Sequence, residues 1–131
     1  MERYIWRRPV GDVFRRLAEP RAIALLYLSL VALSLADMAL TYAIVASGAG
    51  YEVNPAWSAF NADPSLVWSR GLPSSAVAWG LFGLLAAAAW RLPIARRPVA
   101  AAMLAAAIFK AAVVANNAAV LLLHVDLLPL A

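Results

Sequence analysis

The chain has 131 residues, of which 65% are hydrophobic and only 14% are charged, and its formal net charge is +4. A typical soluble domain is about 45–50% apolar and about 25% charged, so this composition excludes an ordinary soluble enzyme, a nucleic-acid-binding domain and a disordered tail. The apolar residues also stand in long runs, whereas a half-buried soluble element alternates apolar and polar residues. The sequence therefore predicts an all-α integral membrane protein.

Residues 1–21 form a basic N-terminal segment, which we expect on the cytoplasmic side. Within it, Val10, Val13, Phe14 and Leu17 recur at helical spacing, with arginines on the other side. This pattern is typical of a short amphipathic helix that lies in the membrane interface. The length of the apolar run that follows, and the aspartate inside it, argue against a cleaved signal peptide.

Three apolar stretches follow, each long enough for the roughly 20 residues that a helix needs to cross a bilayer. We expect one transmembrane domain that is a three-helix bundle, with these bounds: 22–131 for the domain, and about 22–46, 64–90 and 98–123 for its helices. Asp63 and Pro64 predict the start of the second helix, because aspartate caps a helix well and proline suits its first turn. Pro98 predicts the start of the third helix for the same reason.

The basic residues in the connections predict the orientation in the membrane. They stand before the first helix and between the second and third: Arg3, Arg7, Arg8, Arg15, Arg16, Arg21, Arg91, Arg96 and Arg97. The connection over residues 47–63 holds no basic residue. By the positive-inside rule the N-terminus is cytoplasmic and the C-terminus lies outside. We therefore interpret the positive net charge as a topology signal and not as a nucleic-acid-binding surface.

Polar side chains form stripes on the first and third helices, at intervals of seven residues: Tyr27, Ser34 and Thr41, with Asp37 beside them, and Lys110, Asn117 and His124. Polar groups are costly in lipid, so both stripes should face protein or a water-filled cavity. With a rise of about 1.5 Å per residue, Asp37 and Lys110 reach similar heights in the outer half of the bilayer and can form an ion pair. Arg70 is the alternative partner for Asp37, because the pattern does not fix the relative rotation of the helices.

Two short motifs follow one another: Asp37 and Thr41, one helical turn apart, and then the run Gly50-Tyr51-Glu52-Val53-Asn54-Pro55. Together they resemble a family of small bacterial and archaeal three-helix membrane proteins of unknown function. The resemblance covers about residues 22–123. It implies that Arg70 corresponds to a lysine that members of this family carry in the second helix. It also implies that Asn116 or Asn117 corresponds to their asparagine near the end of the third helix. It also implies a multi-pass protein of the bacterial or archaeal cytoplasmic membrane.

The candidate functional residues form an expected polar network near the outer surface: Asp37, Thr41, Glu52, Asn54, Arg70, Lys110, Asn116 and Asn117. One interpretation is a set of buried contacts that fixes helix register, and the other is a path for ions or protons. His124 is the single histidine, so ligation of a haem by two histidines of one chain is excluded, while one axial bond to a pigment or a shared haem stays open. The chain has no cysteine, and we expect neither a metal site nor a cofactor.

Small residues recur every four positions on the second and third helices: Gly83 and Ala87 on the second, and Ala107, Ala111, Ala115 and Ala119 on the third. Rows of this kind let two membrane helices approach closely. Three helices with such rows offer much surface for partners and little space for a pocket. We therefore expect an accessory or assembly subunit that docks on a larger membrane complex through helix packing.

Two other functions remain as alternatives. The first is a homo-oligomeric small transporter or an ion or proton channel that uses Asp37, Lys110 and Arg70. The second is an intramembrane enzyme with Asp37 and Glu52 as its acid and base, although the sequence holds no supported nucleophile spacing and no nucleotide-binding loop. The expected partners are membrane lipids and either other membrane subunits or further copies of this chain, and not nucleic acid.

Overall fold

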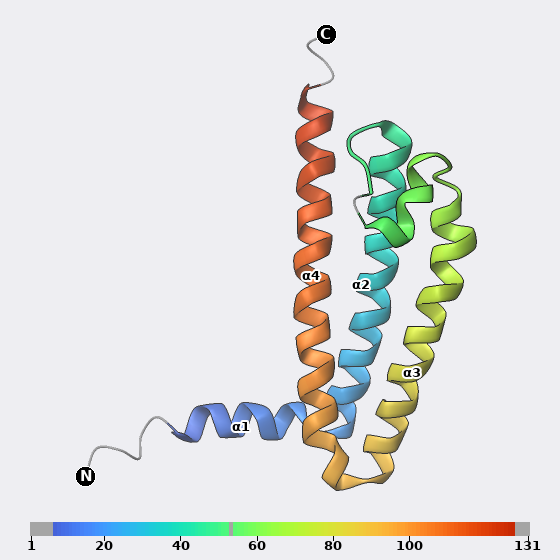
Figure 1. The fold of residues 1–131 in the computed structure, drawn as a ribbon. Coiled ribbons are helices and arrows are strands. Elements are labelled where there is room, and N and C mark those ends of the chain that lie inside the picture. The colour runs from blue at the N-terminus through green and yellow to red at the C-terminus, as the bar shows by residue number, and fades with distance from the viewer. Residues whose placement is uncertain (1–6, 53, 128–131) are drawn as a thin grey trace.

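The structure is a computed structural model that describes residues 7–52 and 54–127. The helices, in chain order, are α1 (Arg7–Leu17), α2 (Pro20–Ser47), the 3₁₀ helix η1 (Pro55–Asn61), the π turn η2 (Val67–Gly71), α3 (Leu72–Arg91), the 3₁₀ turn η3 (Pro93–Ala95) and α4 (Arg96–Leu127). The described residues contain no strand. Three of the helices, counting η2 with α3, are long and apolar enough to cross a membrane. This confirms the predicted all-α three-helix membrane fold (Figure 1).

The N-terminal helix α1 runs crosswise to the bundle, at the end where α2 begins (Figure 1). Asp12 and Arg15 form an ion pair at 3.4 Å on its exposed side. Arg3 and the side chains of Val10 and Phe14 lie outside the described part of the chain. A crosswise course is the one expected of a helix that lies along a membrane surface.

Helix α2 is bounded by a proline and a glycine. It begins at Pro20, slightly before the expected start. Proline suits the first helical position, because the N–H that it lacks would have no partner within the helix there. It ends at Gly48, whose φ of 73° places it in the left-handed region that glycine adopts without strain. There the amide of Ala49 donates to the carbonyl of Ile44 at 3.0 Å, which closes the last turn. The chain then turns back toward the bundle.

The start of the second membrane helix agrees in part with the expectation. Asp63 Oδ1 accepts from the amide of Ser65 at 3.0 Å, and hydrogen-bonded turns follow from Pro64. The regular helix α3, however, begins only at Leu72, after the π turn Val67–Gly71. Pro73 accounts for the wider turn, because it has no N–H to give to the carbonyl four residues before it. The third membrane helix begins slightly before the expected Pro98, at the start of α4, which places Pro98 in the first helical turn.

Helices α2 and α4 run in the same direction and pack on each other more extensively than either packs on α3 (Figure 1). Buried apolar residues of all three helices form the main core near the end that α1 crosses: Ile23, Leu30, Ala89, Val99, Ala100, Met103 and Ala107. A second, smaller cluster joins Met38, Phe60 and Val67, and so ties η1 and η2 to α2. Farther along the α2–α4 interface the facing side chains are polar.

Candidate functional site

A hydrogen-bonded ion pair joins α2 to α4. Lys110 Nζ lies 2.6 Å from Asp37 Oδ2, and Asn117 Nδ2 donates to Asp37 Oδ1 at 2.9 Å. The side chains of Lys110 and Asp37 are 34% and 17% exposed, so the pair is largely withdrawn from the surface. Of the two partners that the sequence left open for Asp37, the structure therefore selects Lys110.

Arg70 lies elsewhere. It stands in the π turn η2, and its side chain is exposed. Among the described residues, the ion pairs recorded are those of Arg15 with Asp12 and of Lys110 with Asp37, and neither includes Arg70. The alternative pairing of Arg70 with Asp37 is thus not made. Gly71, Ser74 and Ser75 line the cavity beside Asp37, whereas the side chain of Arg70 is exposed.

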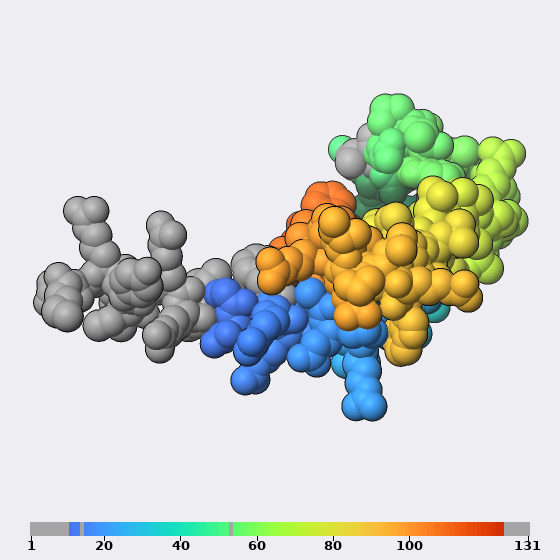
Figure 2. All heavy atoms as spheres, turned by 90° about the horizontal axis from the view of Figure 1, so that it is seen from below, coloured from blue at the N-terminus to red at the C-terminus, as the bar shows by residue number. Residues whose placement is uncertain are grey.

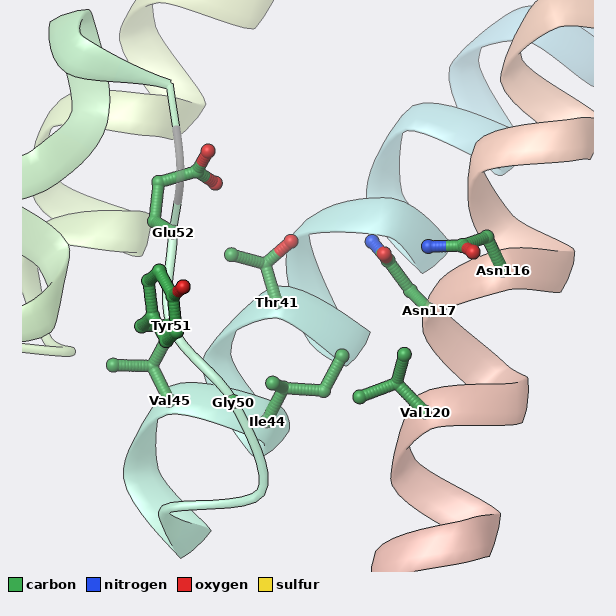
Figure 3. A pocket seen from close by; sticks show the side chains of 9 residues that line it. All are labelled: Thr41, Ile44, Val45, Gly50, Tyr51, Glu52, Asn116, Asn117 and Val120. Carbon is green, nitrogen blue, oxygen red and sulfur yellow. The ribbon is translucent and has the colours of Figure 1, made fainter.

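A cavity of about 250 Å³ opens beside the ion pair, between α2, α4 and the chain after α2 (Figure 3). Its lining comes from these three segments: Thr41, Ile44, Val45, Gly50, Tyr51, Glu52, Asn116, Asn117 and Val120. The amides of Asn116 and Asn117 project from α4 toward Thr41 (Figure 3). Gly50 permits the close approach of the chain, since a Cβ there would stand 3.0 Å from Ile44 Cγ2.

A second cavity, of about 120 Å³, holds the ion pair itself. It is lined from α2, the chain after α2, η1, η2, α3 and α4: Asp37, Met38, Thr41, Glu52, Trp57, Phe60, Val67, Gly71, Ser74, Ser75 and Lys110. Thr41 and Glu52 line both cavities, so the two are neighbours. Most members of the expected polar network therefore meet in one polar region at the end of the bundle away from α1.

The chain after α2 is held in place by a side chain that the sequence analysis did not single out. The amide of Glu52 donates to Asn61 Oδ1 at 2.6 Å, and Asn61 Nδ2 donates to the carbonyl of Glu52 at 3.0 Å. Asn61 thus satisfies both backbone groups of Glu52, as a neighbouring strand would. No local pattern could identify this residue, because its partner lies on the far side of η1 in the sequence.

The side chains of Glu52 and Asn54 complete the turn into η1. Glu52 Oε1 accepts from the amide of Asn54 at 2.8 Å, and Asn54 Oδ1 accepts from the amide of Ala56 at 3.1 Å. Asn54 is therefore the N-cap of a helix that starts at Pro55. The two carboxylates of the enzyme hypothesis, Asp37 and Glu52, each already accept hydrogen bonds within the protein.

Replacing Asn61 by alanine is expected to loosen the chain between α2 and η1. Both bonds to the backbone of Glu52 are lost, and exposed hydrogen bonds of this kind contribute about 1 kcal/mol, so the Glu52 amide should exchange its hydrogen about fivefold faster. Hydrogen–deuterium exchange of that segment measures the effect. Ser58→Ala is the matched control, because Ser58 bonds only to the carbonyl of Pro55 in the same turn. Equal exchange in both variants would contradict the role of Asn61.

His124 lies in the last turns of α4 and is half-buried. It does not belong to the lining of either polar cavity. Within the part of the chain that the structure describes, no three His, Cys, Asp or Glu side chains are grouped so that they could hold a metal ion.

The alanine row of α4 does not stay on one side of the helix. Ala107 is buried in the main core, whereas Ala111, Ala115 and Ala119 are exposed. Four residues advance a helix by about 400°, so each step rotates the row by about 40°. A row with this spacing therefore begins against α2 and ends on the outside of the bundle.

The expected row of small residues on α3 also has one member inside the bundle and one on its surface. A Cβ on Gly83 would stand 3.3 Å from the hydroxyl oxygen of Tyr27, so this glycine serves the packing of α3 on α2. Ala87 is exposed and lines a shallow groove between the same two helices. Tyr27, although part of the expected polar stripe, thus packs against α3 and lines neither polar cavity.

The exposed side of α4 carries a different regular pattern, which we call the α4 outer face. Its members alternate between steps of four and three residues, and all are exposed: Ala101, Ala105, Ile108, Ala112, Ala115, Ala119 and Leu122. Alternation of four and three is the spacing at which one helix contacts another along its whole length. Of the alanines in the predicted row, Ala115 and Ala119 belong to this face.

No protein-family model, no curated protein and no solved structure matches this chain. The resemblance to small three-helix membrane proteins of unknown function therefore stays a prediction.

Proposed function

We propose that this multi-pass membrane protein is a structural subunit that assembles with other transmembrane helices through the α4 outer face. The observation that carries the proposal is the composition of that face. Small residues occupy most of its positions, and they let the backbones of two membrane helices approach closely enough for extensive van der Waals contact.

The outward side of α3 provides an internal comparison. It exposes large apolar side chains, with Val77, Leu81 and Leu84 between 60% and 69% exposed. Large aliphatic side chains are what a helix presents to lipid tails. The α4 outer face also exposes two large side chains, Ile108 and Leu122, but its other five positions are all alanine. This regular row of alanines supports packing against a further helix.

Labelled single-cysteine variants test this proposal cleanly, because the chain has no cysteine of its own. Cysteine at Ala112 or Ala115 would carry a benzophenone maleimide and be illuminated in native membranes. We expect one discrete adduct from both positions, with a mass that identifies either a second copy or a different subunit. Cysteine at Val77 or Leu81 of α3 is the matched control and should give no discrete adduct.

Two further results decide between assembly and lipid exposure. Ala115→Leu, placed next to a cysteine at Ala112, should abolish the adduct, whereas Ala78→Leu on the exposed side of α3 should leave it unchanged. Adducts of equal yield from α3 and α4, or none from α4, would overturn the proposal.

A second candidate function is the movement of protons or small ions through a homo-oligomer. It is favoured by the position of the Asp37–Lys110 pair, which lines a cavity that adjoins the larger polar one. Ionisable groups within a membrane often mark such paths. Flux in proteoliposomes should then be lost in Asp37→Asn, and flux that persists in this variant would exclude the pair from the path.

We also propose an orientation with the N-terminus in the cytoplasm of a bacterial or archaeal cell, and membership of the three-helix family named above. The arginines at the α1 end support the orientation. The convergence of the motif residues supports the membership, because Asp37, Thr41, Glu52 and Asn117 line the two neighbouring cavities. Accessibility of a cysteine placed at Ser58 to an impermeant maleimide in intact cells tests the orientation.

A further inference from the structure

The end of the bundle that α1 crosses contains a recess with a strong excess of positive charge. It has a volume of about 470 Å³ and is lined from two segments far apart in the sequence: Arg15, Arg16, Ala18, Glu19, Pro20, Pro93, Arg96 and Arg97. Figure 2 views this end and shows the residues of α1 and the start of α2, in blue, against those of the α3–α4 connection, in orange. We call it the arginine recess.

The positive charge of the recess is only partly balanced within the protein. Glu19 is the single acidic residue in its lining. Arg15 pairs with Asp12, but at 3.4 Å and with both side chains mostly exposed. Arg96 is held by backbone carbonyls, with Nε 3.1 Å from the oxygen of Ala89 and Nη2 3.3 Å from that of Trp90. Like charges brought together in this way favour a bound anion.

An apolar groove adjoins the recess. It has a volume of about 300 Å³, lies between α2 and α3, and is lined by Pro20, Ile23, Ala24, Ala86, Ala87 and Trp90. Pro20 belongs to both linings, so the groove and the recess meet at the start of α2. A charged site that continues directly into an apolar groove matches a ligand with an anionic head and a hydrocarbon chain.

We propose that the arginine recess and this groove bind one anionic phospholipid, with its phosphate among the guanidinium groups and one acyl chain along the groove. Guanidinium groups are well suited to phosphate oxygens, and basic pockets between membrane helices bind anionic headgroups. The positive-inside rule alone does not require such a recess. Arg21 and Arg91 serve the orientation equally well, yet neither lines the recess.

The experiment uses the full chain purified in dodecyl maltoside, with lipid binding measured by native mass spectrometry. Phosphatidylglycerol should bind, and phosphatidylcholine with the same chains should bind at least tenfold more weakly. Each arginine near an anionic lipid contributes about fivefold, so Arg16→Gln combined with Arg97→Gln should weaken phosphatidylglycerol binding about 25-fold. The double variant Arg21→Gln with Arg91→Gln, which removes the same charge at the same end, should change it less than twofold.

A further arm separates a lipid from a free phosphate. Glycerol 3-phosphate should bind at least a hundredfold more weakly than phosphatidylglycerol, and Ala87→Phe, which narrows the groove, should weaken binding of the lipid only. If the double variant in the recess loses helicity, Arg97→Gln alone decides, with an expected loss of about fivefold. Equal binding of both lipids, equal effects of the two double variants, or equal binding of glycerol 3-phosphate would overturn the proposal.

Discussion

Replacing Lys110 by methionine is expected to destabilise the protein by about 2 kcal/mol, because the carboxylate of Asp37 would lose its countercharge inside the membrane. This loss of stability is smaller than that for a fully buried ion pair, because the side chains of Lys110 and Asp37 are 34% and 17% exposed. Asn117 also keeps its hydrogen bond to Asp37 in this variant. Reversible unfolding in mixed micelles of dodecyl sulfate and dodecyl maltoside, followed by helicity, measures the change.

The double variant Asp37→Asn with Lys110→Met is the control for this effect. It removes both charges, so it should recover most of the stability that Lys110→Met loses. Asp37→Asn alone should be milder than Lys110→Met, because the long lysine side chain can reach toward the interface whereas the aspartate cannot. A double variant less stable than Lys110→Met would show that the two charges do not act as a pair.

The second large effect is expected from Ala89→Leu, with a loss of about 3 kcal/mol. Ala89 is fully buried in the main core, together with Ile23 and Met103, which are also almost completely enclosed. The larger side chain must push α3 away from the other helices. The backbone carbonyl of residue 89 also accepts a hydrogen bond from Arg96 Nε at 3.1 Å. Displacement of α3 should therefore also change the arginine recess.

Ala78→Leu is the matched control for this second effect. It introduces the same side chain on the same helix, but at an exposed position. Surface substitutions of this kind change stability by less than about 0.5 kcal/mol. The same unfolding measurement compares both variants, and losses of similar size would contradict the close packing of α3 at Ala89.

The polar region and the α4 outer face suggest different tasks for the two sides of α4. Its inner side fixes the relative position of α2 and α4 through Lys110 and Asn117. Its outer side is exposed in the part of the chain that the structure describes. A subunit that is to dock through one helix benefits from such a fixed inner contact, because the docking surface then keeps its shape in the absence of the partner.

The sequence predicted the class of protein and the identity of most polar residues at the site. Composition and the length of the apolar runs are local properties, and they suffice to predict membrane helices. The cost of polar groups in lipid was also enough to predict that Asp37 and Lys110 face the protein. The cap at Asp63 was expected from its place before a proline, because capping depends on adjacent residues only, and its Oδ1 accepts from the amide of Ser65 at 3.0 Å.

The choice of partner and the assignment of faces required the tertiary structure. Whether Asp37 meets Lys110 or Arg70 depends on the rotation of α2 relative to α4, which no single helix determines. Asn61 and Glu52 meet only because the chain folds back after α2. The arginine recess likewise unites the connection between α1 and α2 with the connection between α3 and α4, which are far apart in the sequence. Membrane class follows from composition, whereas contacts between distant segments follow from packing, and packing is decided by all the helices together.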